Sequence, residues 1–174
     1  ARLKLNAFHW HLTDYPAWRI QCKKYPILND PSKRIKGRDV NDTYTYDQIR
    51  DLFRYARKRH IQIIPEIDMP GHSTYFKNCF GFPMHDPRGI KILEELLEEF
   101  CREIPVEMSP YLHIGADEIH IPNGKQFADR MAAKVKSLGR QPIQWAGNND
   151  LPVSGDSYAQ LWNCLLYTSD AADE

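Results

Sequence analysis

Hydrophobic positions follow two alternating patterns along this chain. Five short apolar runs have the length and composition of β-strands: 2–8, 61–67, 111–114, 142–145 and 157–162. Between them, apolar residues recur every three or four positions, which predicts helices over about 45–60, 86–104 and 127–138. Thr45 and Gln48 form a capping box before the first helix, and Gly139 closes the last. Four glutamates of the middle helix fall largely outside its apolar stripe: Glu94, Glu95, Glu98 and Glu99.

The alternation of strands and helices predicts a parallel sheet in an α/β fold. Polar and aromatic residues follow the strand ends: Asp14, His72, Asp117, Glu118 and Trp145. A (β/α)8 barrel builds its site from the loops that follow its strands. A doubly wound sheet shows the same alternation but usually binds its ligand at a glycine-rich phosphate loop, and neither GxGxxG nor GxxxxGK[ST] occurs here. We therefore predict a TIM barrel, incomplete because five strands cannot close one.

The segment at 111–119, YLHIGADEI, places two carboxylates directly after a strand. Successive side chains of a strand point to opposite faces, so Asp117 and Glu118 can share a site only where the backbone turns. Gly115 permits such a turn. Two acids held close have pKa values that move apart, so one is ionised while the other is protonated. This pair is suited to breaking an acetal bond.

The composition, 42% hydrophobic and 26% charged over 174 residues, is typical of one globular domain. The sequence lacks a run of 18 apolar residues, so no membrane span is predicted. Residues 164–174, CLLYTSDAADE, resemble the translation of a sequencing-library adapter. We therefore expect 1–163 to be the native part, a piece of a longer catalytic barrel, and 164–174 not to be native.

The net charge and the cysteine spacing argue against nucleic-acid-binding, zinc-binding and disulfide-rich proteins. The adapter-like tail carries three acids, and without it the formal charge rises from 0 to about +3, which is too low to indicate nucleic-acid binding. The remaining cysteines are odd in number and widely spaced, so neither a zinc site nor a disulfide framework is predicted: Cys22, Cys79 and Cys101.

Three motifs occur in order along the chain: LNAFHWHLTD at 5–14, IPEIDMPGHS at 64–73 and HIGADE at 113–118. Together they resemble glycoside hydrolase family 20, the β-N-acetylhexosaminidases, and the similarity extends from Leu3 to Trp162. The resemblance implies a (β/α)8 catalytic barrel, of which this chain would hold about strands 2 to 6. One departure is Ala116, where the family usually has a second glycine. If this residue has a positive φ, alanine adds strain.

The resemblance implies hydrolysis of terminal β-linked N-acetylhexosamine residues from glycans by substrate-assisted retention, in which the 2-acetamido oxygen attacks C1. Glu118 would be the general acid and then the base. Asp117 would stay ionised, accept the acetamido N–H and stabilise the oxazolinium-like intermediate.

The resemblance also implies further site residues. Trp145 and Trp162 would enclose the N-acetyl group, although both could instead be core tryptophans. Asp14 and His72 would bind on the substrate side and support Asp117, with Asp68 as a partner behind them. No cofactor and no metal are expected. The expected partners are glycans that contain N-acetylglucosamine or N-acetylgalactosamine, and secretion or periplasmic export follows from family analogy alone.

Two other hypotheses remain open. His9 and His11 are two apart on a strand, as in metal-dependent amidohydrolase barrels, and further ligands could come from His113, His120 and Asp117. The interpretation that we favour for His9 and His11 is packed, hydrogen-bonded strand residues, and we interpret Glu66 as a packing or rim residue. The second hypothesis is a non-catalytic sugar-binding remnant. An incomplete barrel exposes strand edges and apolar core, so we expect the 174-residue chain to fold poorly.

Overall fold

The structure, a computed structural model, describes residues 4–35 and 43–162. The adapter-like tail at 164–174 therefore lies outside the described residues. Five strands form one parallel sheet: β1 (Ala7–His11), β4 (Gln62–Glu66), β5 (Tyr111–His113), β6 (Gln141–Ala146) and β7 (Tyr158–Leu161). Their order in the sheet is their order in the chain. A doubly wound sheet reverses its order at a switch point, so this sheet is part of a (β/α)8 barrel.

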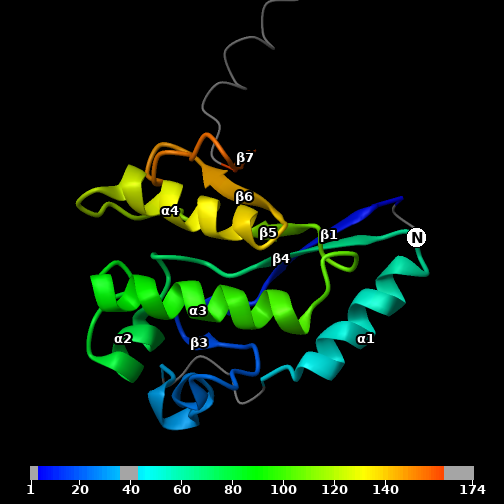
Figure 1. The fold of residues 1–174 in the computed structure, drawn as a ribbon, viewed down its shortest axis with the longest axis horizontal. Helices are drawn as coiled ribbons and strands as arrows, with labels where there is room; N and C mark the ends of the chain where they lie inside the picture. The colour runs from blue at the N-terminus through cyan, green and yellow to red at the C-terminus, as the bar shows by residue number, and fades with distance from the viewer. Residues whose placement is uncertain (1–3, 36–42, 163–174) are drawn as a thin grey trace, which may run out of the picture.

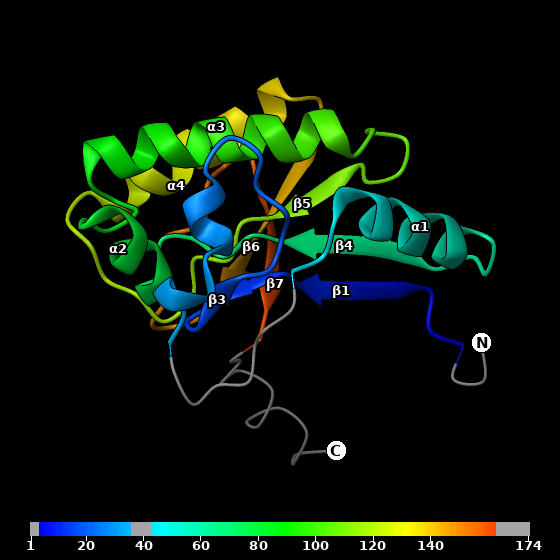
Figure 2. The same cartoon turned by 90° about the horizontal axis from the view of Figure 1, so that it is seen from below.

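Within the described ranges, four α-helices lie between β1 and β4, between β4 and β5 and between β5 and β6, whereas a loop at 147–157 connects β6 to β7. They are α1 (Tyr46–Arg57), α2 (Thr74–Phe80), α3 (Pro87–Glu103) and α4 (Gly124–Ser137). Figures 1 and 2 show α1, α3 and α4 on the same side of the strands. Between β1 and α1, the described residues include two short antiparallel strands and two 3-10 turns: β2 (Thr13–Asp14), β3 (Ala17–Trp18), η1 (Pro26–Asn29) and η2 (Pro31–Lys33).

Local signals fix where the helices begin and end. Thr45 Oγ1 accepts a hydrogen bond from Gln48 N at 3.2 Å, and Gln48 Oε1 accepts one from Thr45 N at 2.8 Å, which confirms the predicted capping box. Asp86 caps α3 by accepting from Arg88 N at 2.9 Å. After α4, Gly139 has a φ of +79°, the left-handed conformation that ends many helices.

Glu99 corrects the predicted surface of α3. The helical pattern placed it largely outside the apolar stripe, yet the residue is only 1% exposed. Its carboxylate accepts hydrogen bonds from Lys23 N and Lys24 N, each at 2.8 Å, and from Tyr46 Oη at 2.9 Å. The acid therefore fixes the segment before α1 onto α3, a role that periodicity within one helix does not reveal.

The two edge strands expose apolar side chains. Phe8 of β1 is 45% exposed, Leu5 just before that strand is 66% exposed, and at β7 the values are 59% for Tyr158 and 67% for Leu161. The strands between them are more deeply buried. In the described part of the chain, no helix is long and apolar enough to cross a bilayer.

Candidate active site

The predicted site residues gather at the carboxyl ends of the parallel strands. Each of the five strands contributes at least one of them: Asp14 beyond β1, Asp68 and His72 beyond β4, Asp117 and Glu118 beyond β5, Trp145 near the end of β6 and Trp162 after β7. Parallel pairing brings these ends to one edge of the sheet, where the loops of a barrel form its site.

The imidazole of His72 lies between the acids. Its Nδ1 is 3.4 Å from Asp14 Oδ1. Its Nε2 is 3.5 Å from Asp117 Oδ2 and 3.4 Å from Glu118 Oε2. The two neighbouring acids therefore converge on one ring rather than pointing to opposite sides of the sheet. The Glu118 side chain is 53% exposed, so a substrate can reach it.

Unusual backbone angles produce this convergence. Gly115, Ala116 and Glu118 have φ values of +65°, +81° and +49°. The turn brings consecutive side chains to the same place, which a regular strand cannot do. Ala116 therefore adopts the positive φ considered in the sequence analysis, at a cost of about 1–2 kcal/mol relative to glycine.

Asp68 occupies the space beside Gly115. A Cβ atom at Gly115 would lie 1.8 Å from Asp68 Oδ1, so no other residue fits there without displacing the acid. Asp68 itself is 0% exposed. Its Oδ1 accepts a hydrogen bond from Ala116 N at 3.3 Å. Asp68, which follows β4, thus packs directly against the turn that follows β5.

The electrostatic environment raises the pKa of two acids. For Asp117 the main cause is burial; His72 acts in the opposite direction, and Glu66 and Asp150 add smaller repulsions. For Asp68, burial and the nearby charges of Asp117 and Glu66 raise the pKa well above its ordinary value. The sequence analysis considered repulsion only between positions 117 and 118, and the structure adds Asp68 as an acid that interacts with Asp117.

Asp150 joins the second acid to an indole. Its Oδ1 accepts from Glu118 N at 3.0 Å, and its Oδ2 accepts from Trp162 Nε1 at 2.8 Å. Trp162 is 44% exposed, which argues against the alternative that it is a core tryptophan. The sequence analysis missed Asp150, because an acid in a polar loop carries no local signal of this contact.

Glu66 is the centre of a buried hydrogen-bond network. Strand register places it opposite His11 on one side and His113 on the other. Its Oε2 lies 2.5 Å from His11 Nδ1 and 2.9 Å from His9 Nε2, and its Oε1 accepts from Trp145 Nε1 at 2.8 Å. Glu66 is only 1% exposed and holds the indole that was predicted to line the acetyl pocket.

Charges in this network compensate one another. Burial alone would raise the pKa of Glu66, but the hydrogen bonds from His11 and His9 outweigh it and hold that pKa far below the usual range. Burial alone would lower the pKa of His11, but Glu66 raises it to about 9. At neutral pH the two residues therefore form an ion pair. Burial lowers the pKa of His113 to about 3, so this ring is neutral.

Glu66 was interpreted from sequence as a packing or rim residue, and its contacts require a different interpretation. A signal was available: an acid inside an apolar strand, two positions before Asp68, so both point to the same face. His9 and His11 do face one way, as the HxH spacing predicted, and they face this carboxylate.

The residues of this network can also be tested as ligands of a metal ion. His9, Glu66 and His113 each offer a donor atom within 4.8 Å of the others. However, Glu66 already accepts from Trp145 Nε1, and His113 Nδ1 accepts from Gly115 N at 3.0 Å. His120, the further ligand considered from sequence, is exposed and outside this group. The residues therefore fit a hydrogen-bond network better than a metal centre.

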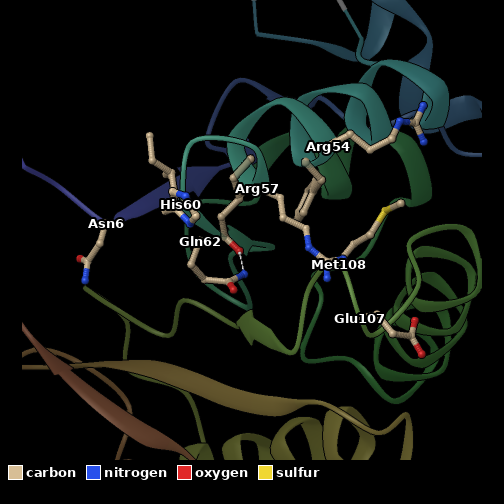
Figure 3. Close-up of a pocket in the computed structure, with 10 residues that line it drawn as sticks. Asn6, Arg54, Arg57, His60, Gln62, Glu107 and Met108 are labelled. Atoms are coloured by element: carbon tan, nitrogen blue, oxygen red, sulfur yellow. Dashed lines mark hydrogen bonds between the residues drawn. The ribbon is translucent and has the colours of Figure 1, made fainter. Parts of the chain in front are cut away.

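A hollow of about 480 Å³ lies at the opposite end of the sheet, where the strands begin (Figure 3). Residues that precede or begin β1, β4 and β5 line it together with α1, and they include Asn6, Arg57, His60, Gln62 and Met108. Sites of barrel enzymes form at the carboxyl ends of the strands, so we assign this hollow no part in the chemistry.

Comparisons with known proteins agree with the motifs. Residues 1–80 match the model for "Glycosyl hydrolase family 20, catalytic domain". A β-hexosaminidase of Vibrio furnissii is 33% identical, with 93% of this chain and 35% of the relative covered. A β-hexosaminidase of Porphyromonas gingivalis is 38% identical, with 68% of this chain and 18% of the relative covered. The chain thus spans about a third or less of these relatives.

Solved structures give the same result for the fold. A β-N-acetylhexosaminidase from Bacteroides fragilis superposes with a TM-score of 0.73 at 30% identity, covering 92% of this chain and 39% of the other. A family 20 exo-β-N-acetylglucosaminidase from Vibrio harveyi, in complex with N-acetylglucosamine, also gives 0.73, at 26% identity, covering 92% and 34%.

Proposed function

This chain belongs to glycoside hydrolase family 20, and we propose that residues 1–163 form part of the catalytic barrel of an enzyme that releases terminal β-linked N-acetylhexosamine from glycans. The observation that carries the proposal is the convergence of Asp117 and Glu118 on the ring of His72. Two acids at one place, one exposed and one half-buried, suit a reaction that needs a proton donor and a fixed negative charge.

Glu118 acts as the general acid. Its half-exposed carboxyl protonates the leaving glycosidic oxygen and then, as carboxylate, removes a proton from the attacking water. The hydrogen bond from Glu118 N to Asp150 fixes its backbone, which keeps the carboxyl in reach of the scissile bond.

Asp117 acts as the anion that assists the substrate. Its carboxylate accepts the N–H of the 2-acetamido group and orients the carbonyl oxygen for attack on C1. Positive charge develops on the cyclised intermediate, and a nearby carboxylate stabilises it. Burial raises the pKa of Asp117, while the neighbouring His72 favours the ionised form that this role requires.

The two indoles enclose the acetamido group. Glu66 holds Trp145 through its ring N–H, and Asp150 holds Trp162 in the same way. Flat indole faces fixed in this manner pack against a methyl group and an amide plane. We therefore propose selection for N-acetylated sugars, with both N-acetylglucosamine and N-acetylgalactosamine glycans as candidate substrates.

Inhibition by a thiazoline analogue of the cyclised intermediate tests this mechanism. The complete protein that carries this segment should bind N-acetylglucosamine-thiazoline much more tightly than N-acetylglucosamine, because the analogue resembles the intermediate. Replacement of Asp117→Asn should slow the cyclisation step. Replacement of Glu118→Gln should slow substrates with poor leaving groups more than activated aryl glycosides, and equal losses on both would contradict the acid role.

A metal-dependent hydrolase is the second candidate, because His9, Glu66 and His113 bring three donors together. Treatment with a strong chelator distinguishes the two mechanisms. Substrate-assisted hydrolysis survives the chelator, whereas loss of activity that returns with added divalent metal would favour the metal mechanism.

A further inference from the structure

Three carboxyl groups lie close together at the strand ends, and they differ in the histidines that accompany them. Glu66 is paired with His11, at 2.5 Å. Asp117 lies 3.5 Å from His72. The contacts of Asp68 with described residues include no such pair: its Oδ1 accepts from Ala116 N at 3.3 Å, and its Oδ2 is buried without a hydrogen-bond partner.

Asp68 is also the most deeply buried of the three acids, at 0% exposure. An ionised carboxylate without a cation or several donors is very costly in such a place, so the group binds a proton instead. The titratable groups that act on it or lie close to it come from β1, β4, α2 and the loops beyond β4 and β5: His11, Glu66, His72, Tyr75 and Asp117. The carboxylates of Glu66 and Asp117 oppose ionisation of Asp68, and the charge of His11 favours it but is outweighed by burial and these two acids.

Like Asp68, Asp117 has one carboxyl oxygen without a hydrogen-bond partner among the described residues. This oxygen, Oδ1, is buried. One oxygen of Asp68, one oxygen of Asp117 and one ring nitrogen of His72 lie within 4.8 Å of one another. If Asp68 carries a proton, its hydroxyl can donate a hydrogen bond toward Asp117, and each carboxyl group then has a hydrogen-bond partner.

We propose that Asp68 is a neutral carboxylic acid in the folded protein and that its hydroxyl donates toward Asp117, holding that carboxylate in place for the substrate. Asp68 is thus a positioning residue, and the inference rests on the role proposed for Asp117. The proton stays on Asp68 through the reaction, so Asp117 keeps its negative charge. The direction of the pKa change for Asp68 agrees with this assignment.

Infrared spectroscopy tests the protonation state without any assay of activity. The complete protein that carries this segment should show the carbonyl stretch of a protonated carboxylic acid at neutral pH. The band should be missing from the Asp68→Asn variant and present in the Asp129→Asn variant, whose acid is exposed and paired with Lys125. If the Asp68→Asn spectrum keeps the band, or the parent lacks it, the proposal is wrong.

The pH dependence of stability is a second test. A carboxyl whose folded pKa is raised binds a proton in the folded state and loses it in the unfolded state, so it reduces stability as pH rises above the unfolded value of about 4. Asp68→Asn should therefore become progressively more stable than the parent between about pH 4 and pH 7. A variant that is less stable than the parent at neutral pH and equal to it at acid pH would show an ionised Asp68.

Kinetics separate this proposal from that of the overall function. Asn resembles a protonated Asp, so Asp68→Asn should keep most of kcat and leave the acid limb of the pH profile unmoved, whereas Asp68→Ala should lower kcat about tenfold or more. A large downward shift of the acid limb in Asp68→Asn would mean that a charge had been removed. Dependence of this limb on a chelator would indicate a cation between the two acids and would also overturn the proposal.

Discussion

At the residue scale, carboxyl groups of similar intrinsic acidity have different surroundings and therefore different charges. Glu66 is ionised because His11 and His9 contact it, although it is only 1% exposed. Asp117 lies beside His72, half-buried, and Glu118 reaches further into solvent. The chemistry of the site thus depends on which histidine contacts each acid. Strand register sets the contact of Glu66 with His11, and the turn after β5 sets the contacts of Asp117 and Glu118 with His72.

Gly115→Ala tests the packing of that turn. In the complete protein that carries this segment, the added Cβ would lie 1.8 Å from Asp68 Oδ1 at a φ of +65°, so we expect a loss of about 2–5 kcal/mol in unfolding free energy from overpacking and backbone strain. Gly139→Ala is the matched control. It has a φ of +79° with nothing within 4 Å of the new atom, so it should cost only the backbone strain of about 1–2 kcal/mol. Equal losses in denaturant unfolding would contradict the role of Asp68 in this turn.

Glu66→Gln tests the support of the indole. The single oxygen of the new side-chain amide can accept a hydrogen bond from Trp145 or from His11, but its NH2 group then faces the other of these two donors. The indole ring of Trp145 therefore loses its fixed position. We expect kcat/KM on an N-acetylated substrate to fall about tenfold or more, equivalent to at least ~1.4 kcal/mol. The NMR signal of the Trp145 indole N–H should shift as well. Glu107→Gln, at an exposed position, is the control and should change neither quantity.

The residues that touch the substrate in our proposal were predictable from sequence, and those that hold them were not. Asp117 and Glu118 carry a strong local signal, since two acids and a glycine follow an apolar strand. The link from Glu66 to Trp145 joins positions 79 residues apart. A single sequence does not specify such a contact, because strand register and side-chain direction must both be known.

At the element scale, periodicity predicted the three long helices and four of the five strands close to their observed bounds. The first strand is an error: it was predicted at 2–8 but is observed at Ala7–His11, because its extent is set by parallel pairing with β4, which local alternation does not reveal. The apolar stripes pack against the sheet: Ile49 and Phe53 of α1, Leu93, Leu97 and Phe100 of α3, and Met131 and Val135 of α4 are all buried. The predictions are wrong where an element is positioned by contacts with a segment that is distant in the sequence. Glu99 is the clear case, because its partners come from the loop before α1.

In the complete protein that carries this segment, Glu99→Ala should therefore destabilise the fold much more than a neighbouring change. The buried carboxylate accepts three hydrogen bonds, and its loss leaves the donors of Lys23, Lys24 and Tyr46 without an acceptor, so we expect about 2–4 kcal/mol from chemical denaturation. Glu98→Ala is one position away and removes only a partly exposed ion pair with Lys134, so it should cost less than about 1 kcal/mol. Similar values for the two variants would show that Glu99 does not anchor the loop.

At the scale of the whole molecule, sequential strand order and one-sided helices give part of a barrel whose edge strands are unpaired on one side (Figure 2). The sequence predicted this fold class because alternation and strand-end chemistry both pointed to it. The exposure of individual edge residues required the structure, since it depends on how far the sheet extends.

The isolated 174-residue chain should associate with itself. Apolar surface is exposed on the two edge strands, at Phe8, Tyr158 and Leu161, and just before β1, at Leu5. Unpaired strand edges also add strands from other molecules. Light scattering after size-exclusion chromatography should detect aggregates or higher oligomers, with no cooperative thermal transition. A stable monomer that unfolds cooperatively and hydrolyses substrate would contradict this expectation.

The central claim is that Asp117 and Glu118 act together on a sugar whose own acetamido oxygen is the nucleophile. The most direct measurement is kcat/KM of the complete protein on aryl N-acetylglucosaminides whose acetamido methyl carries increasing numbers of fluorine atoms. Fluorine withdraws electrons from the carbonyl oxygen, so the account predicts a steep and progressive fall in kcat/KM across the series. A rate that is independent of fluorination would show that another group attacks C1 and would contradict the account.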